Sequence, residues 1–114
     1  MNLPTSETTQ HHADSTASLR MVLKLMDRWQ LDAEQRASVL AMGNDESNRS
    51  ELFYLLLATH KQLQLLFPVN RQLAYRWMTS RNDAFGGLKP IELVQRQGAQ
   101  GLQMIHHYLQ RLFA

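Results

Sequence analysis

Glycine and proline residues between positions 77 and 101 interrupt a chain whose apolar residues otherwise recur at the spacing of α-helices. Gly86 and Gly87 follow closely on an Asn-Asp pair, and glycine accepts the positive φ angles of tight turns. Pro90 suits the first position of a helix, because its φ is fixed and it has no amide hydrogen to leave unpaired. Gly98 is expected to end that helix. The stretch therefore predicts a helix end, a loop, a short helix, a break and a new helix.

The apolar spacing predicts an all-α fold, a small bundle of about five to six helices with a disordered N-terminal tail. No alternating apolar and polar segment of useful length indicates a strand. The expected helices cover residues 15–29, 32–43, 47–66 or 50–66, 69–79, 90–97 and 99–113. The third of these is apolar on nearly every side, which indicates a central helix or a helix shared with a second subunit.

Four of the expected helices have an apolar or small-residue face that should turn inward. The faces of the first two helices consist of Leu19, Val22, Leu23, Met26 and Trp29, and of Ala33, Ala37, Leu40 and Ala41. The faces of the fourth and last consist of Leu73, Ala74, Trp77 and Met78, and of Leu102, Ile105, Leu109 and Leu112. Asp32 and Gln35 have the spacing of a capping box at the start of the second helix.

We expect three regions in the chain: a disordered tail (1–13), an N-terminal helical region (14–49) and a C-terminal helical domain (50–114). Charge is also distributed unevenly along the chain. Residues 1–68 hold six basic and eight acidic residues, a net charge of −2, whereas residues 69–114 hold six basic and two acidic residues, a net charge of +4. The positive half can face nucleic acid, an acidic protein surface or solvent. Without cysteine, a secretory signal or a long apolar run, we expect a cytoplasmic protein that does not span a membrane.

Few residues offer catalytic or metal-binding chemistry. Gly86 and Gly87 lack the lysine and Ser/Thr of a phosphate-binding loop. His106 and His107 are adjacent, so on a helix they point about 100° apart and do not chelate as an i,i+4 pair. The histidines at positions 11 and 12 lie in the polar tail, without further ligands nearby. We therefore expect a binding protein with no catalytic residue, no metal site and no cofactor.

An ordered set of residues resembles the toxin-binding domain of Xre/MbcA/ParS-type antitoxins: Trp77, Asn82, Phe85, Gly86, Gly87, Pro90, Leu93, Gly98, Gly101, Leu102, Ile105 and Leu109. The likeness covers roughly residues 50–113 well and residues 18–42 more loosely. Within the latter, residues 29–40 resemble the start of an Xre-type helix-turn-helix. Residues 43–50, GNDESNRS, are short, polar and partly acidic, so the recognition helix is expected to be reduced or absent.

This resemblance implies an antitoxin that binds and neutralises a cognate toxin by covering its active site. The toxin would be of the RES class, which resembles ADP-ribosyltransferases and consumes NAD. The resemblance also implies a homodimer, whereas the short segment at residues 43–50 puts DNA binding in doubt. The partner-binding residues would be Arg81, Asn82, Phe85, Gly86, Gly87, Lys89, Pro90, Arg96, Gln103, His106, His107, Tyr108 and Arg111, with Gln97 among the surface groups between them. Two alternatives stay open: a DNA-binding transcriptional autoregulator and a non-catalytic helical adaptor dimer.

Overall fold

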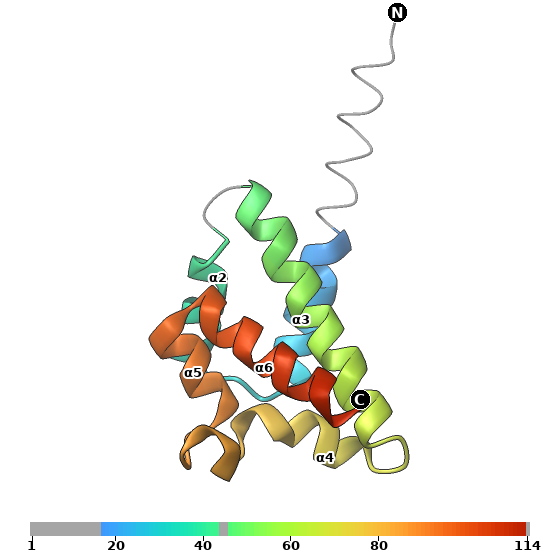
Figure 1. Cartoon of the computed structure of the whole chain (residues 1–114). Helices are drawn as coiled ribbons and strands as arrows, with labels where there is room; N and C mark the ends of the chain where they lie inside the picture. The colour runs from blue at the N-terminus through green and yellow to red at the C-terminus, as the bar shows by residue number, and fades with distance from the viewer. Residues whose placement is uncertain (1–16, 44–45, 114) are drawn as a thin grey trace, which may run out of the picture.

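The computed structural model describes residues 17–43 and 46–113, and all regular structure in these two ranges is helical. An N-terminal helix covers residues 17–28, and the expected tail at residues 1–13 lies outside the described ranges. The elements that follow are α2 (Ala33–Ala41), α3 (Glu46–Leu66), α4 (Arg71–Arg76), the 3₁₀ turns η1 (Trp77–Thr79) and η2 (Asp83–Phe85), α5 (Pro90–Gln97) and α6 (Ala99–Leu112) (Figure 1). The predicted all-α fold is therefore confirmed for the described residues.

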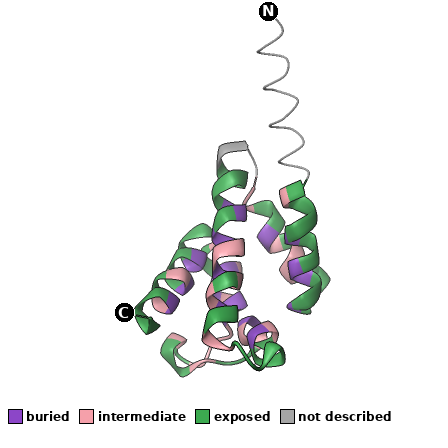
Figure 2. Cartoon of the chain, turned by 90° about the vertical axis from the view of Figure 1, so that its right-hand side faces the viewer, coloured by how far each residue is buried: buried purple, intermediate pink, exposed green. Residues whose placement is uncertain are grey.

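The long helix α3 and the last helix α6 form the centre of the bundle. They pack against each other, and α6 also packs along α5. Helix α4 lies against α3, while α2 lies against α5 on the other side of the molecule (Figure 1). Buried residues lie along the inward sides of the helices, as Figure 2 shows. The α5–α6 pair is therefore supported on one side by α3 and on another by α2.

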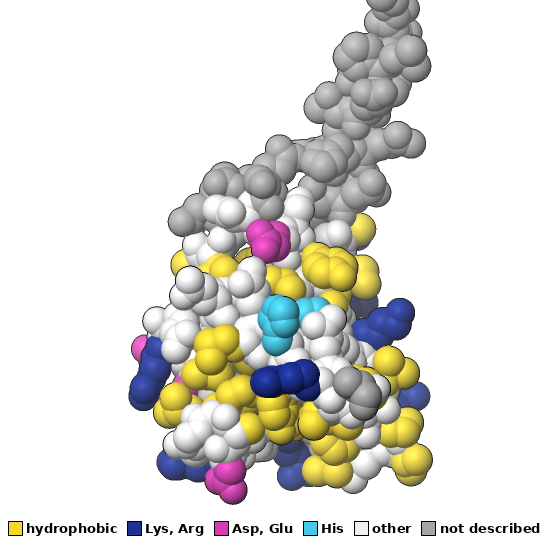
Figure 3. Space-filling model, in the orientation of Figure 1, with side chains coloured by type: hydrophobic (Ala, Val, Ile, Leu, Met, Phe, Trp, Pro, Cys, Tyr) yellow, Lys and Arg dark blue, Asp and Glu magenta, His cyan; other side chains and the backbone are white. Residues whose placement is uncertain are grey.

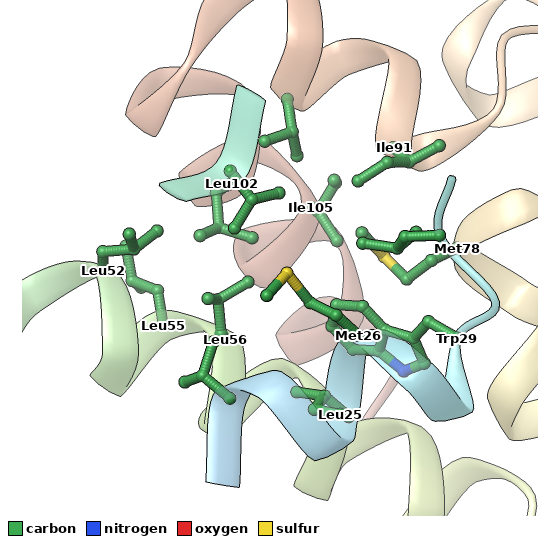
Figure 4. Close-up of a cluster of buried hydrophobic side chains, with 14 of the residues drawn as sticks. Leu25, Met26, Trp29, Leu52, Leu55, Leu56, Met78, Ile91, Leu102 and Ile105 are labelled. Atoms are coloured by element: carbon green, nitrogen blue, oxygen red, sulfur yellow. The ribbon is translucent and has the colours of Figure 1, made fainter. Parts of the chain in front are cut away.

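The hydrophobic core joins the N-terminal helix to the C-terminal helices. Met26 and Trp29 are almost completely buried, as are Leu56 of α3, Ile91 of α5 and Ile105 of α6. Figure 4 shows these side chains converging on one another. The core cluster thus contains residues from both sides of position 50, where we expected one region to end and the next to begin.

Aromatic and charged side chains add a second link between the N-terminal helix and the rest. The Arg28 guanidinium lies over the ring of Tyr75 in α4, 5.6 Å from its centroid. On α3, His60 stacks on the same ring at 6.1 Å. Burial, and to a smaller extent the charge of Arg28, lowers the pKa of His60 below its usual value of 6.5. His60 is therefore a neutral partner at pH 7, which allows it to share Tyr75 with a cation.

Several side chains predicted to face inward are exposed. In the N-terminal helix, Leu25 is buried while Leu19 and Leu23 are exposed, although Val22, Met26 and Trp29 are buried as predicted. The predicted face and the observed buried face both have the spacing of a helix. This spacing shows which residues share a face, but the neighbouring helices determine which face is buried.

The same correction applies to three other helices. In α2 the buried residue is Val39, and the predicted face of Ala33, Ala37, Leu40 and Ala41 is exposed. Leu73 of α4 is 48% exposed and Leu112 of α6 is 47% exposed. Leu112 is the last residue of its helix. Leu73 lies in α4, a helix of six residues in which only Ala74 is buried. In α2, α4 and α6, the buried face is therefore smaller than the sequence predicts.

The predicted capping box of α2 is present and fixes the connection to the N-terminal helix. The Asp32 side chain accepts a hydrogen bond from the Gln35 amide at 2.8 Å, and the Gln35 side chain accepts one from the Asp32 amide at 2.9 Å. Before this box, Gln30 has a φ of 57°, in the left-handed region. The Leu31 amide donates to the Met26 carbonyl at 3.1 Å, as in a Schellman motif. The N-terminal helix therefore ends at a position that favours glycine.

Replacing Gln30 with glycine should stabilise the protein. A left-handed conformation costs a residue with a side chain about 1–2 kcal/mol, and the greater freedom of glycine in the unfolded chain offsets roughly 0.5–1 kcal/mol of that gain. We expect the free energy of unfolding, measured by urea denaturation, to rise by about 0.5–1 kcal/mol. Gln30→Ala, which keeps the Cβ atom, serves as the control and should give no such gain. An equal or lower stability for Gln30→Gly would contradict this account of the helix end.

Candidate functional site

The loop between α4 and α5 is closed by the backbone and side chain of Asn82. Its side-chain oxygen accepts a hydrogen bond from the Ala84 amide at 2.9 Å. Its carbonyl accepts hydrogen bonds from the amides of Phe85 and Gly87, each at 3.0 Å. Gly86 and Gly87 have φ angles of 67° and 84°, which explains the glycine pair. The loop is therefore a fixed turn that holds Phe85 in place.

The start of α5 and the α5–α6 junction are also locally determined. Pro90 is the first residue of α5, and the Glu92 carboxylate accepts a hydrogen bond from the Lys89 amide at 2.8 Å. Gly98 joins the two helices with φ 60° and ψ −133°, a conformation that is essentially restricted to glycine. A Cβ atom added to Gly101 would lie 2.3 Å from the Leu93 carbonyl oxygen. The two helices therefore touch backbone to backbone, which only glycine at position 101 permits.

Three aromatic rings gather where the loop meets α6. Phe85 and Tyr108 make an edge-to-face contact with a centroid distance of 5.1 Å. Trp77 lies 6.2 Å from Phe85 and 6.3 Å from Tyr108. All three are partly buried and pack against the core cluster. They form one rigid aromatic group that links η1, the loop and the last helix.

A groove of about 860 Å³ lies beside this aromatic group, along the outward face of α6. It is lined by Ala84, Phe85, Gln97, Gln100, Gln103, Met104, His107, Tyr108, Gln110 and Arg111. The lining therefore combines an apolar wall, four glutamine amides and the basic side chains of His107 and Arg111. No aspartate or glutamate is among the lining residues.

On the face of the molecule that carries α6, histidine and basic side chains lie among hydrophobic ones, as Figure 3 shows. At the edge of the groove, Gln103 donates a hydrogen bond from its side chain to the Glu51 carboxylate at 3.3 Å. Arg111 has no ion pair or side-chain hydrogen bond within the described part of the chain. The guanidinium group is therefore available to a binding partner.

His106 does not line the groove, whereas the adjacent His107 does. It is partly buried, and its Nδ1 atom has no hydrogen-bond partner among the described residues. Burial, followed by the proximity of His107, lowers the pKa of His106 below its usual value of 6.5. His106 is therefore neutral at pH 7 and acts as a packing residue behind the groove, whereas His107 is exposed in it.

The thirteen sequence-predicted partner-binding residues divide into three groups. Those that line the groove are Phe85, Gln103, His107, Tyr108 and Arg111. Those that shape the loop and helix start, or lie behind the groove, are Asn82, Gly86, Gly87, Lys89, Pro90 and His106. Arg81 and Arg96 are exposed outside it. The structure thus brings five of them together around the groove.

Sequence reasoning missed four lining residues: Ala84, Gln100, Met104 and Gln110. A usable signal was present in α6. Positions 100, 103, 104, 107, 110 and 111 recur at helical spacing on the side opposite the buried stripe of Leu102, Ile105 and Leu109. The helical period therefore predicts which face of α6 is turned away from the core, whereas the groove on that face also requires Ala84, Phe85 and Gln97 from other elements.

Comparison with known protein families matched one part of the chain. Residues 62–114 match the model of a family described as the antitoxin Xre/MbcA/ParS C-terminal toxin-binding domain. No curated protein and no solved structure matched the chain significantly. The matched segment begins within α3 and includes every residue that lines the groove.

Proposed function

Residues 62–114 belong to the antitoxin Xre/MbcA/ParS toxin-binding domain family, and we propose that this chain neutralises a RES-type toxin by placing the α6 groove against it. Such a toxin resembles ADP-ribosyltransferases and consumes NAD. In this proposal the chain carries out no chemistry itself. It acts by occupying the entrance to the toxin's active site, so that NAD is kept out.

The position of the groove is the observation that supports this proposal. All ten residues that line it fall within the family segment, and they come from three elements, η2, α5 and α6, that this segment holds together. The α5–α6 contact at Gly101 and the closed loop at Asn82 fix their relative positions. A preorganised surface loses little conformational freedom on binding, which favours tight association.

The composition of the groove suits a protein partner. Interfaces are enriched in aromatic residues, methionine and arginine, and this groove contains Phe85, Tyr108, Met104 and Arg111. The net charge of +4 over residues 69–114 would also favour encounter with an acidic surface around the toxin's active site.

Co-expression with the protein encoded by the adjacent gene tests the proposal. We expect that protein alone to arrest growth and to deplete cellular NAD. Co-expression of this chain should restore both growth and the NAD level, and the two proteins should co-purify as a stable complex. Growth arrest that persists while this chain is present in soluble form would contradict an antitoxin role. If this chain restored growth but the partner protein alone did not deplete NAD, the antitoxin role would stand and only the assignment of the toxin to the RES class would be contradicted.

A further inference from the structure

We propose that the groove receives a polypeptide segment of the toxin in which an apolar side chain and a carboxylate lie close together. The apolar side chain would contact Met104 and Tyr108, and the carboxylate would pair with Arg111. This inference rests on the proposed function, and it specifies which part of a toxin the α6 groove recognises.

The apolar part of the groove would hold the anchoring side chain. Met104 is 45% exposed although it lies near the middle of α6, between buried residues. Beside it, Phe85 and Tyr108 present ring surface that is fixed by Trp77 behind them. Buried apolar side chains in preformed pockets contribute much of the energy of protein interfaces. The methionine can adjust to the shape of the anchor, since its side chain is flexible.

The glutamine side chains favour a polypeptide backbone as the rest of the ligand. Gln97, Gln100, Gln103 and Gln110 each carry a hydrogen-bond donor and an acceptor. A peptide backbone alternates donors and acceptors, so it can satisfy both ends of these amides. A phosphate or another fully deprotonated anion would use only the donors. The hydrogen bond between Gln103 and Glu51 also orients one of the four amides before binding.

Arg111 supplies the charge preference. It is the last lining residue of α6, it is exposed, and no aspartate or glutamate lies among the lining residues to neutralise it. A guanidinium group pairs with a carboxylate through two parallel hydrogen bonds. Glu51, at the edge of the groove, accepts a hydrogen bond from Gln103, and Glu92, the nearest carboxylate in the sequence, accepts one from the Lys89 amide. Neither residue lines the groove or pairs with Arg111. The missing negative charge is therefore expected to come from the partner.

Helix geometry sets the distance between anchor and carboxylate. Tyr108 precedes Arg111 by three residues and Met104 precedes it by seven, which correspond to about 5 Å and 10 Å along the helix axis. An extended segment advances about 3.3 Å per residue. The carboxylate should therefore lie about two or three residues from the apolar anchor in an extended segment, or about one turn away if the toxin presents a helix.

Affinity measurements with the toxin encoded by the adjacent gene test this inference. We expect Arg111→Gln to weaken the complex about tenfold or more, because an interaction with a charged group is lost. The salt dependence of the affinity should also become shallower. Arg76→Gln is the matched control, since Arg76 is an exposed arginine on α4 that neither lines the groove nor belongs to the predicted partner-binding set. Its affinity should stay within about twofold of the parent chain. Thermal unfolding of both variants would verify that they fold.

A charge exchange identifies the carboxylate. Arg111→Glu should abolish most of the binding, and one of the toxin's aspartates or glutamates, changed singly to arginine, should restore it. We expect that carboxylate to lie two to four residues from an exposed apolar side chain. A complex that forms with undiminished affinity for Arg111→Glu would overturn this inference and leave the toxin-binding role intact. Failure of the parent chain to bind the toxin at all would overturn both.

Discussion

Replacing Gly101 by alanine should destabilise the protein by about 2–3 kcal/mol, the usual cost of forcing extra atoms into a packed interior. The added Cβ atom would lie 2.3 Å from the carbonyl oxygen of Leu93 and 2.6 Å from its carbonyl carbon. Both are backbone atoms, so no side chain can rotate away, and α5 must separate from α6. Alanine is a better helix former than glycine by about 1 kcal/mol, which is less than this cost. Urea denaturation followed by far-UV circular dichroism measures the difference.

Gly43→Ala provides the matched control for this substitution. Gly43 has no left-handed φ, and an added Cβ atom would meet Arg49 at 3.5 Å, an ordinary van der Waals distance. The same chemical change should therefore be neutral there, or stabilise by about 0.4–1 kcal/mol through the unfolded state. If Gly101→Ala were equally harmless, the backbone contact between α5 and α6 would not be the feature that holds these helices together.

Replacing Tyr108 by alanine should weaken toxin binding by about 2 kcal/mol or more, the loss typical of a central aromatic residue in an interface. This corresponds to a dissociation constant about 30-fold higher. Tyr108 lines the groove and contacts both Phe85 and Trp77, so its removal takes away contact surface and loosens the aromatic group. Isothermal titration calorimetry with the purified toxin, well below the melting temperature of the variant, measures the change.

Two further variants separate binding from folding. Tyr108→Phe keeps the ring contacts and should bind nearly as well as the parent chain, since only the hydroxyl group is lost. Tyr54→Ala removes a tyrosine that is 66% exposed on α3 and does not line the groove. We expect no effect of Tyr54→Ala on toxin affinity. If Tyr108→Ala bound the toxin with unchanged affinity, the α6 groove would not be the binding surface.

The sequence predicted the C-terminal helices closely because their limits depend on local residues. Pro90 and Gly98 bound α5 at the predicted positions, and α6 ends one residue before its predicted end. These limits follow from fixed or left-handed backbone angles, which are properties of single residues. The predicted helix over residues 69–79 is instead α4 followed by a 3₁₀ turn. The sequence contains no glycine or proline where α4 gives way to the 3₁₀ turn, at Arg76 and Trp77, so no local signal marks this transition.

The faces of the helices and the composition of the groove were less accessible to sequence reasoning. Leu19, Leu23, Leu73 and Leu112 are exposed because each helix is covered only where another element reaches it. The lining residues Gln100 and Gln110 resemble ordinary solvated residues until Phe85 is placed beside α6. That placement results from a loop closed around Asn82 and from contacts among three elements. It is a property of tertiary structure, which a spacing pattern in one helix does not contain.

The core shared by Met26, Trp29 and Ile91 has a consequence for any attempt to transplant the toxin-binding segment. A fragment cut to residues 62–114 would lose the first sixteen residues of α3 together with the N-terminal helix. Side chains such as Ile105 and Ile91, which are completely buried in the whole chain, would then meet water. The smallest portable unit is therefore larger than the stretch that defines the family. Substitutions at Met26 or Trp29 should therefore weaken toxin binding by disturbing the shared core, although neither residue lines the groove.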